Sequence, residues 1–334
     1  MQKLPFDAVY YEPAALAYPL CKTLREEFGA LPWRPIESHN RIPEFTAASN
    51  EDFSALKRHV IVGVRKTHRY VPNHKVSDWL VPYTSSGCRA MCLYCYLVCN
   101  YNKCAYLRLF VNREEMLEKL LRADAKAPAP QTYEIGSNSD LVLENTITGN
   151  LPWTIARFAR EGRGRLTFPT KFHMVEPLLS LDHRGKTIFR MSVNPQQLIA
   201  RVELGTSPLQ ARVHALNSMA AAGYPVGLII APVILSPGWE ALYGGLIEEL
   251  QAGLSGRVKR EGFIEIIFMT YSYVQNAINT EAFPHAPALF DPALMTGRGR
   301  GKYCYRPALR AEGERFLREK LGACLGGMPV LYIV

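Results

Sequence analysis

Five of the eight cysteines in this chain of 334 residues crowd into one short segment, and three of them have a spacing that suits an iron–sulfur cluster. Cys88, Cys92 and Cys95 follow the pattern C-x₃-C-x₂-C, and Cys99 and Cys104 come soon after them. Each of three thiolates can bind one iron of a [4Fe–4S] cubane, whereas clusters that only carry electrons ordinarily use four cysteines. The remaining iron could then be chelated by the amino and carboxylate groups of S-adenosylmethionine. The spacing therefore predicts a [4Fe–4S] cluster that cleaves S-adenosylmethionine.

A zinc site is the competing interpretation of the same cysteines. Structural zinc needs four ligands, commonly as paired C-x₂-C units or as C-x₂-C with a histidine pair. Cys99 or Cys104 could supply a fourth sulfur, but no histidine pair follows at the spacing of a zinc finger. The loop also precedes a series of strands and helices instead of forming a small separate finger. We expect the cluster, and a zinc-bearing DNA-binding module stays as the non-enzymatic alternative.

A basic, glycine-rich segment near the C-terminus could contact DNA. The chain carries a formal charge of +9, which favours a polyanionic partner, although a merely basic surface would have the same composition. The residues that we expect to meet DNA are Arg298, Arg300, Lys302, Tyr303, Tyr305 and Arg306. Arginines contact phosphates, and tyrosines can stack on unpaired bases. The segment is one residue short of a phosphate-binding loop and lacks its Ser/Thr, so we reject that motif. The alternative to a DNA contact is a mobile cationic loop.

Strand-like and helix-like segments alternate from residue 60 onward and must position these groups. The expected strands are Val60–Val64, Leu107–Val111, Thr132–Ile135, Leu166–Phe168, Thr187–Val193, Val226–Val233 and Phe263–Phe268. The expected helices are Arg113–Ala125, Pro152–Glu161, Pro208–Ala222, Gly238–Leu254 and Pro307–Leu321, with Asn112 and Ser207 as candidate N-terminal caps. Such alternation predicts a parallel α/β sheet. About six units are too few for a closed eight-stranded barrel, so we expect a partial, open (β/α)6-type barrel with ligands at the carboxyl ends of its strands.

We expect three parts along the chain. Residues 1–58, rich in proline and aromatic residues, would form an irregular N-terminal cap. Residues 59–270 would form the partial barrel, and residues 271–334 a C-terminal region that contacts substrate and DNA. No apolar run is long enough to span a membrane, and the first residues lack the pattern of a signal peptide. A cytoplasmic protein is therefore expected.

The cysteine spacing resembles that of the radical S-adenosylmethionine superfamily, and several further segments resemble its spore photoproduct lyase family over nearly the whole chain. Upstream they are Tyr10-Tyr11-Glu12-Pro13, Ser38-His39-Asn40, Val62-Gly63-Val64-Arg65-Lys66-Thr67 and Cys92-Leu93-Tyr94-Cys95-Tyr96-Leu97. Downstream they are Thr170-Lys171-Phe172-His173, Phe189-Arg190-Met191-Ser192-Val193-Asn194, Ile230-Ala231-Pro232 and Gly301-Lys302-Tyr303-Cys304-Tyr305-Arg306. The resemblance implies repair of the thymine dimer of ultraviolet-damaged spore DNA by a 5′-deoxyadenosyl radical. It also implies an electron donor such as flavodoxin or ferredoxin, and DNA containing thymine photoproducts as the partner.

The resemblance also implies roles for particular residues. Ser139, Lys171, Ser192 and Ala231 match the positions that hold S-adenosylmethionine in the family. Tyr94 and Tyr96 match tyrosines that relay a hydrogen atom between substrate and deoxyadenosyl group. The residues themselves agree in part, because a lysine at a strand end can pair with the methionyl carboxylate and serine hydroxyls can donate hydrogen bonds. The alternatives are a solvated surface lysine and tyrosines that only pack against the cysteine loop.

Two departures from the family concern residues that the resemblance places near the substrate. Ser137 stands where the family has its hydrogen-donating cysteine, and a hydroxyl is a far poorer hydrogen-atom donor than a thiol. Cys304, or one of Cys99 and Cys104, could supply the hydrogen instead, and we favour Cys304 because it lies in the basic segment. Alternatively, the chain acts on another photoproduct, such as a cyclobutane dimer. Residues 268–271 also lack a basic residue that the family carries there.

Overall fold

The main element of the computed structural model, which describes residues 6–99 and 106–334, is a curled sheet of eight strands. Its order is β18-β14-β13-β11-β10-β9-β5-β4, and all neighbours are parallel except β5 and β4. The strands are β4 (Val71–Pro72), β5 (Trp79–Leu80), β9 (Thr132–Glu134), β10 (Arg165–Thr170), β11 (Thr187–Val193), β13 (Val226–Val233), β14 (Phe263–Phe268) and β18 (Val330–Ile333). Every residue of β11 is buried, as expected for a central strand of a parallel sheet that is covered on both faces. The predicted α/β class and open half-barrel are confirmed.

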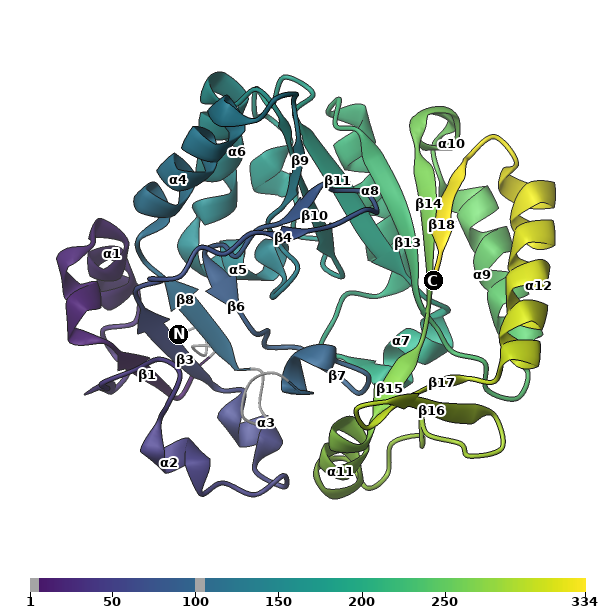
Figure 1. Cartoon of the computed structure of the whole chain (residues 1–334), viewed down its shortest axis with the longest axis horizontal. Coiled ribbons are helices and arrows are strands. Elements are labelled where there is room, and N and C mark those ends of the chain that lie inside the picture. Colours follow the sequence, from purple (N-terminus) through teal and green to yellow (C-terminus); the bar gives the residue numbers. More distant parts are fainter. Residues whose placement is uncertain (1–5, 100–105) are drawn as a thin grey trace.

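Helices follow the strands and cover the outside of the half-barrel (Figure 1). They are α4 (Arg113–Lys126), α5 (Leu141–Thr148), α6 (Asn150–Glu161), α7 (Gln196–Val202), α8 (Leu209–Ala221), α9 (Trp239–Gly253), α10 (Gly256–Glu261) and α12 (Pro307–Leu325). In α6 the apolar side chains recur on one face, which includes the buried Leu151, Ile155 and Phe158, so burial of that face holds the helix on the sheet. No helix in the described part of the chain is long and apolar enough to cross a membrane.

A second sheet forms beside the half-barrel from the first part of the chain (Figure 1). Its order is β2-β1-β3-β8-β6, with bounds β1 (Ala8–Tyr11), β2 (Trp33–Pro35), β3 (His59–Gly63), β6 (Ser85–Ser86) and β8 (Leu107–Phe110). The expectation that residues 1–58 are irregular is therefore wrong, because β1 pairs in parallel with β2 and β3, and α1 (Pro19–Glu27) packs nearby. Strands β3 and β8 form as expected, but they belong to this sheet and not to the half-barrel. The sequence did not distinguish the two, because a buried β-branched run does not reveal which sheet it joins.

Of the two expected helix caps, Asn112 is the N-cap residue of α4 but Ser207 is not that of α8, and neither side chain hydrogen-bonds to the first turn's backbone. Asn112 precedes α4, but its side chain exchanges two hydrogen bonds of 2.9 Å with the backbone of Arg65. The Ser207 hydroxyl accepts from the backbone N–H of His173 at 3.1 Å, and α8 begins after Pro208. In both cases the side chain hydrogen-bonds to the backbone of a loop that is distant in sequence, and not to backbone N–H groups of the helix.

The C-terminal region carries a small antiparallel sheet and then returns to the half-barrel. Strands β15 (Thr270–Ser272), β17 (Lys302–Tyr305) and β16 (Met295–Gly299) pair in that order, with α11 (Tyr273–Ala282) following β15. Helix α12 then packs against α9, and β18 adds to the edge of the main sheet beside β14. Residues 307–334 are thus part of the half-barrel, while residues 270–305 form the sheet that projects from it (Figure 1).

Candidate functional site

Three of the four residues expected to hold S-adenosylmethionine meet at the carboxyl ends of adjacent strands. Lys171 directly follows β10, Ser192 lies in β11 and Ala231 lies in β13. The Lys171 ammonium donates to the Ser192 hydroxyl at 2.7 Å and to the Ala231 carbonyl at 2.9 Å. Because parallel strands share a carboxyl edge, residues far apart in sequence converge there. Lys171 is only partly exposed and fully hydrogen-bonded, so it is not a solvated surface lysine.

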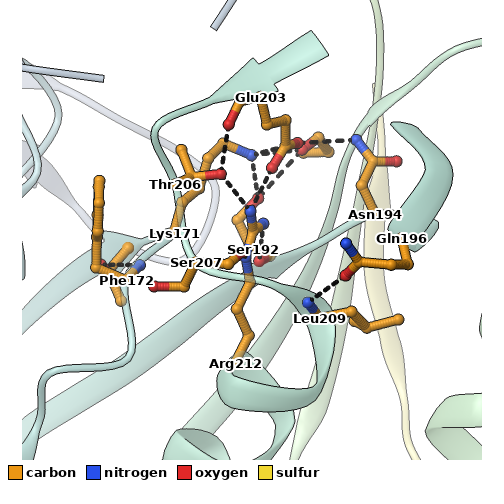
Figure 2. Close-up of polar contacts among 12 residues, drawn as sticks. Lys171, Phe172, Ser192, Asn194, Gln196, Glu203, Thr206, Ser207, Leu209 and Arg212 are labelled. Carbon is orange, nitrogen blue, oxygen red and sulfur yellow. Dashed lines mark hydrogen bonds and ion pairs between the residues drawn. The ribbon is translucent and has the colours of Figure 1, made fainter. Parts of the chain in front are cut away.

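A buried carboxylate that the sequence did not reveal organises this edge of the sheet. The Oε1 atom of Glu203 accepts from Lys171 at 3.1 Å, from Asn194 at 3.0 Å and from the Tyr94 hydroxyl, and its Oε2 accepts from Arg212 at 2.6 Å. Figure 2 shows Lys171, Asn194 and Arg212 around Glu203. Burial alone would raise the pKa of Glu203, but Lys171 and Arg212 lower it to about 2, so the carboxylate is ionised.

The cysteine loop is fixed to the same place by backbone pairing. Strand β7 (Met91–Cys92) pairs with β12 (Glu203–Leu204), and Cys92 lies opposite Glu203. On the other side of the loop, the buried Lys57 donates from its ammonium to the carbonyl of Cys88 at 2.6 Å. These contacts place the loop next to the carboxyl edge of the half-barrel.

The donor set of the loop fits a cubane cluster with one iron left open. Desolvation raises the pKa of the Cys88 thiol to about 12. Desolvation and the negative charge of Glu203 also raise the pKa of the Cys92 thiol, while the positive charge of Lys171 lowers it in part. All three thiols belong to the one loop that β7 and the Lys57 contact fix in place. Bound iron would hold them as thiolates. Across residues 6–99 and 106–334 no three Cys, His, Asp or Glu side chains converge on one metal position, which a cubane does not require because each thiolate binds its own iron.

The other two cysteines of the segment do not join these three in the described structure. The Cys99 sulfur is hydrogen-bonded to the Ser272 hydroxyl at 3.1 Å, and Cys99 is exposed. Cys104 lies outside the described residues. A fourth protein ligand from Cys99, as a zinc site would need, is not in place.

The loop after β9 is held by a second carboxylate. Asp140 caps α5 by accepting from two backbone N–H groups at 3.1 Å, and it also accepts from the Thr170 hydroxyl at 2.8 Å and the Lys171 N–H at 2.9 Å. Asp140 therefore ties this loop to the one that carries Lys171. Ser139, the fourth expected cofactor residue, directly precedes Asp140, and its hydroxyl is hydrogen-bonded to that of Ser85 at 2.6 Å. Ser85 is in the strand that leads into the cysteine loop.

The two expected relay tyrosines have different surroundings. The Tyr94 hydroxyl donates to Glu203, and burial together with the Glu203 charge raises the pKa of Tyr94, so the phenol keeps its hydrogen. The Tyr96 side chain is 56% exposed, and its hydroxyl donates to the main-chain carbonyl of Ser137. Tyr96 thus lies beside Ser137, where the resemblance places the family's cysteine.

The basic segment forms a hairpin whose tip is exposed. Arg298, Arg300 and Lys302 are exposed on β16, the turn and the start of β17. Arg300 and Gly301 have φ angles of 52° and 68°, which is the conformation that a tight two-residue hairpin turn requires at both central positions. Cys304 lies partly buried in β17 opposite Thr270. Because side chains alternate along a strand, Cys304 shares a face with Lys302.

The remaining residues of the segment hold the hairpin in place. Tyr305 is only 5% exposed and its hydroxyl accepts from the backbone N–H of Leu235 at 2.9 Å, so the expectation that it stacks on a base is wrong. Tyr303, on the same face, packs on the Phe290 ring with centroids 4.5 Å apart. Arg306 is exposed, but its guanidinium donates to two backbone carbonyls at the base of the hairpin.

Comparison with known proteins identifies the family of this chain. The family model described as Spore photoproduct lyase matches residues 4–333. A spore photoproduct lyase of Bacillus subtilis (strain 168) is 34% identical over 321 residues, which cover 94% of this chain and 92% of the relative. A solved spore photoproduct lyase variant with bound AdoMet and dinucleoside spore photoproduct is 30% identical, with a TM-score of 0.91 over 99% of this chain and 100% of that chain. The chain described here belongs to the spore photoproduct lyase family.

Proposed function

We propose that this chain is a radical S-adenosylmethionine lyase that reverses the spore photoproduct in DNA to two thymines. The observation that carries the proposal is the Lys171 ammonium, held between Ser192, Ala231 and Glu203 directly beside the cysteine loop. An ammonium in this position can pair with the methionyl carboxylate of S-adenosylmethionine. The spore photoproduct lyase solved with AdoMet and dinucleoside spore photoproduct supports the same assignment.

Cys88, Cys92 and Cys95 would hold the [4Fe–4S] cluster. When bound, the reduced cluster supplies the electron that cleaves S-adenosylmethionine and so generates the 5′-deoxyadenosyl radical. The chain's own residues bind and orient the cofactor: Lys171 pairs with its carboxylate, and Asp140 keeps the lysine loop in register with the loop after β9. An electron donor such as flavodoxin or ferredoxin would reduce the cluster.

The return of a hydrogen atom needs a donor other than Ser137. Tyr94 and Tyr96 would relay the atom, since one lies at the cofactor edge and the other beside Ser137. The Ser137 hydroxyl holds its hydrogen too strongly to replace a thiol. We propose Cys304 as the donor, because it lies in the hairpin sheet on the face of Lys302, and Cys99 as the alternative, because it follows Tyr96 by one turn of the same short helix (Tyr96–Cys99).

The hairpin would bind the DNA backbone through Arg298, Arg300 and Lys302. These cations are exposed at its tip and are free of ion pairs among the described residues. Tyr303 would act as a partly exposed aromatic surface for an unpaired base.

A second candidate function is lysis of another photoproduct, such as a cyclobutane dimer, and Ser137 is the observation that favours it. Anaerobically reconstituted protein should be incubated with defined dinucleotide lesions, reductant and S-adenosylmethionine. Thymine from the spore photoproduct supports the first function, and thymine from the cyclobutane dimer alone supports the second. A zinc-bearing binding module would form no 5′-deoxyadenosine with either lesion.

A further inference from the structure

We infer that Glu203 is a positioning residue that holds the cofactor-binding lysine and the first relay tyrosine on one carboxylate. The inference rests on the proposed function and adds to it a residue outside the cofactor, relay and cluster residues named above. Its Oε1 atom is shared by the Lys171 ammonium and the Tyr94 hydroxyl, and its backbone pairs with Cys92. One side chain thus connects the cofactor site, the relay and the cysteine loop.

Arg212 keeps Glu203 in place independently of Lys171. Its guanidinium is fully buried and donates to Glu203 Oε2 at 2.6 Å, to the Ser192 carbonyl at 2.9 Å and to the Ser207 carbonyl at 2.8 Å. Such multiple fixed donors define one geometry for the carboxylate. Asn194, also buried, donates to the other oxygen at 3.0 Å. The carboxylate therefore keeps its position when Lys171 changes partners.

The charges of this group leave room for an anionic ligand. Lys171 and Arg212 contribute two positive charges and Glu203 one negative charge, so the group carries a net charge of +1. An ammonium has three donors, and those of Lys171 are directed at Ser192, Ala231 and Glu203. An incoming carboxylate must displace one of these partners. If Lys171 leaves Glu203 for the incoming carboxylate, Glu203 still accepts from Arg212 and Asn194. An uncharged side chain at position 203 would not attract the Lys171 ammonium to the strand end.

The same oxygen fixes the phenol of Tyr94. The hydroxyl points at Oε1, so the distance between the relay oxygen and the cofactor lysine is set by a single acceptor. The main chain of Tyr94 is held separately, since its carbonyl accepts from the Gln275 side chain at 2.5 Å. Loss of the Glu203 charge should therefore move the hydroxyl and the lysine without moving the backbone that carries the cysteines.

The test compares E203Q with E265Q, because Glu265 is an equivalent residue away from the site. Glu265 is also buried, is also paired with a buried arginine, Arg190, at 3.0 Å, and also accepts from a tyrosine hydroxyl, that of Tyr332. Both substitutions remove a carboxylate from a buried ion pair, so both should lower the midpoint of thermal unfolding. Only E203Q changes the surroundings of Lys171 and Tyr94.

Two quantities should separate the variants. For E203Q we expect S-adenosylmethionine to bind about tenfold more weakly, since the ion pair that holds Lys171 at the strand end becomes a neutral contact, and more 5′-deoxyadenosine to form per lesion repaired. For E265Q both quantities should stay within about twofold of the wild type, which is the scatter of changes outside the site. E203D, which keeps a charge opposite Arg212 but retracts it from Lys171 and Tyr94, should show the same two changes with a smaller loss of stability.

Failure of the proposed function and failure of the positioning role of Glu203 would give different results. A wild-type protein that forms no 5′-deoxyadenosine would contradict the proposed function. An active wild type with E203Q and E203D indistinguishable from E265Q in cofactor affinity and in the ratio of 5′-deoxyadenosine to repair would overturn the positioning role of Glu203 alone.

Discussion

The Tyr96 hydroxyl donates to the main-chain carbonyl of Ser137, so the tyrosine that we propose as the second relay residue is anchored to the residue that we match to the family's cysteine. Because the acceptor is a backbone atom, the contact does not depend on the side chain at position 137. Substitutions there can therefore change the chemistry of the donor without displacing Tyr96.

Ser137→Cys should improve the coupling of radical formation to repair. A thiol placed beside Tyr96 gives up its hydrogen atom far more readily than a hydroxyl, so fewer molecules of 5′-deoxyadenosine should form per thymine pair released. Chromatographic counting of both products measures the ratio. Ser137→Ala is the matched control and should behave like the wild type. Equal ratios for the cysteine and alanine variants would show that position 137 is not near the substrate radical.

Cys304→Ala should have the opposite effect. If Cys304 returns the hydrogen atom, its loss should raise the ratio of 5′-deoxyadenosine to repaired lesion at least several-fold. Cys324→Ala, which removes a partly buried thiol from α12, serves as the control and should leave the ratio unchanged. Identical ratios for the two variants would remove Cys304 as the donor and direct attention to Cys99.

The hairpin cations should govern the salt dependence of DNA binding. Arg298→Gln and Arg300→Gln should each reduce the slope of log affinity against log salt by about one, since each removes one phosphate contact. Arg315→Gln, on the exposed side of α12, removes the same charge away from the hairpin and should leave the slope unchanged. Titrations of labelled DNA at several salt concentrations measure the slope, and an unaltered slope in both hairpin variants would exclude this segment as the contact.

Glu12 should make the stability of the N-terminal sheet depend on acid. Burial alone would raise its pKa, but hydrogen bonds from His39 and the Val64 N–H lower it from 4.5 to about 2. Since the folded pKa lies below the unfolded one, the stabilisation is fully present above about pH 4.5 and is lost as the pH falls toward 2. It amounts to roughly 3 kcal/mol. Glu12→Gln should flatten this part of the curve of unfolding free energy against pH, and exposed Glu37→Gln should not.

The sequence predicted the residues that lie at strand ends and missed those that join loops. Lys171 and Ser192 were expected from the family resemblance, and the strand pattern agrees, because parallel strands bring their carboxyl ends together. The positions of Glu203 and Asp140 depend on which loops meet at the carboxyl edge of the sheet, and no local sequence pattern indicates those contacts. Tyr305 was misplaced because alternating residue types do not show which face of a hairpin packs on the protein.

The central claim is that the edge formed by Lys171, Glu203 and the cysteine loop performs radical cleavage of S-adenosylmethionine for repair of a thymine dimer. Product analysis on synthetic spore photoproduct tests it most directly. Reduced, reconstituted protein should release thymine from this lesion together with 5′-deoxyadenosine, and Cys92→Ala should release neither. Failure of the reconstituted wild type to form either product, or thymine release that survives in Cys92→Ala, would contradict the account.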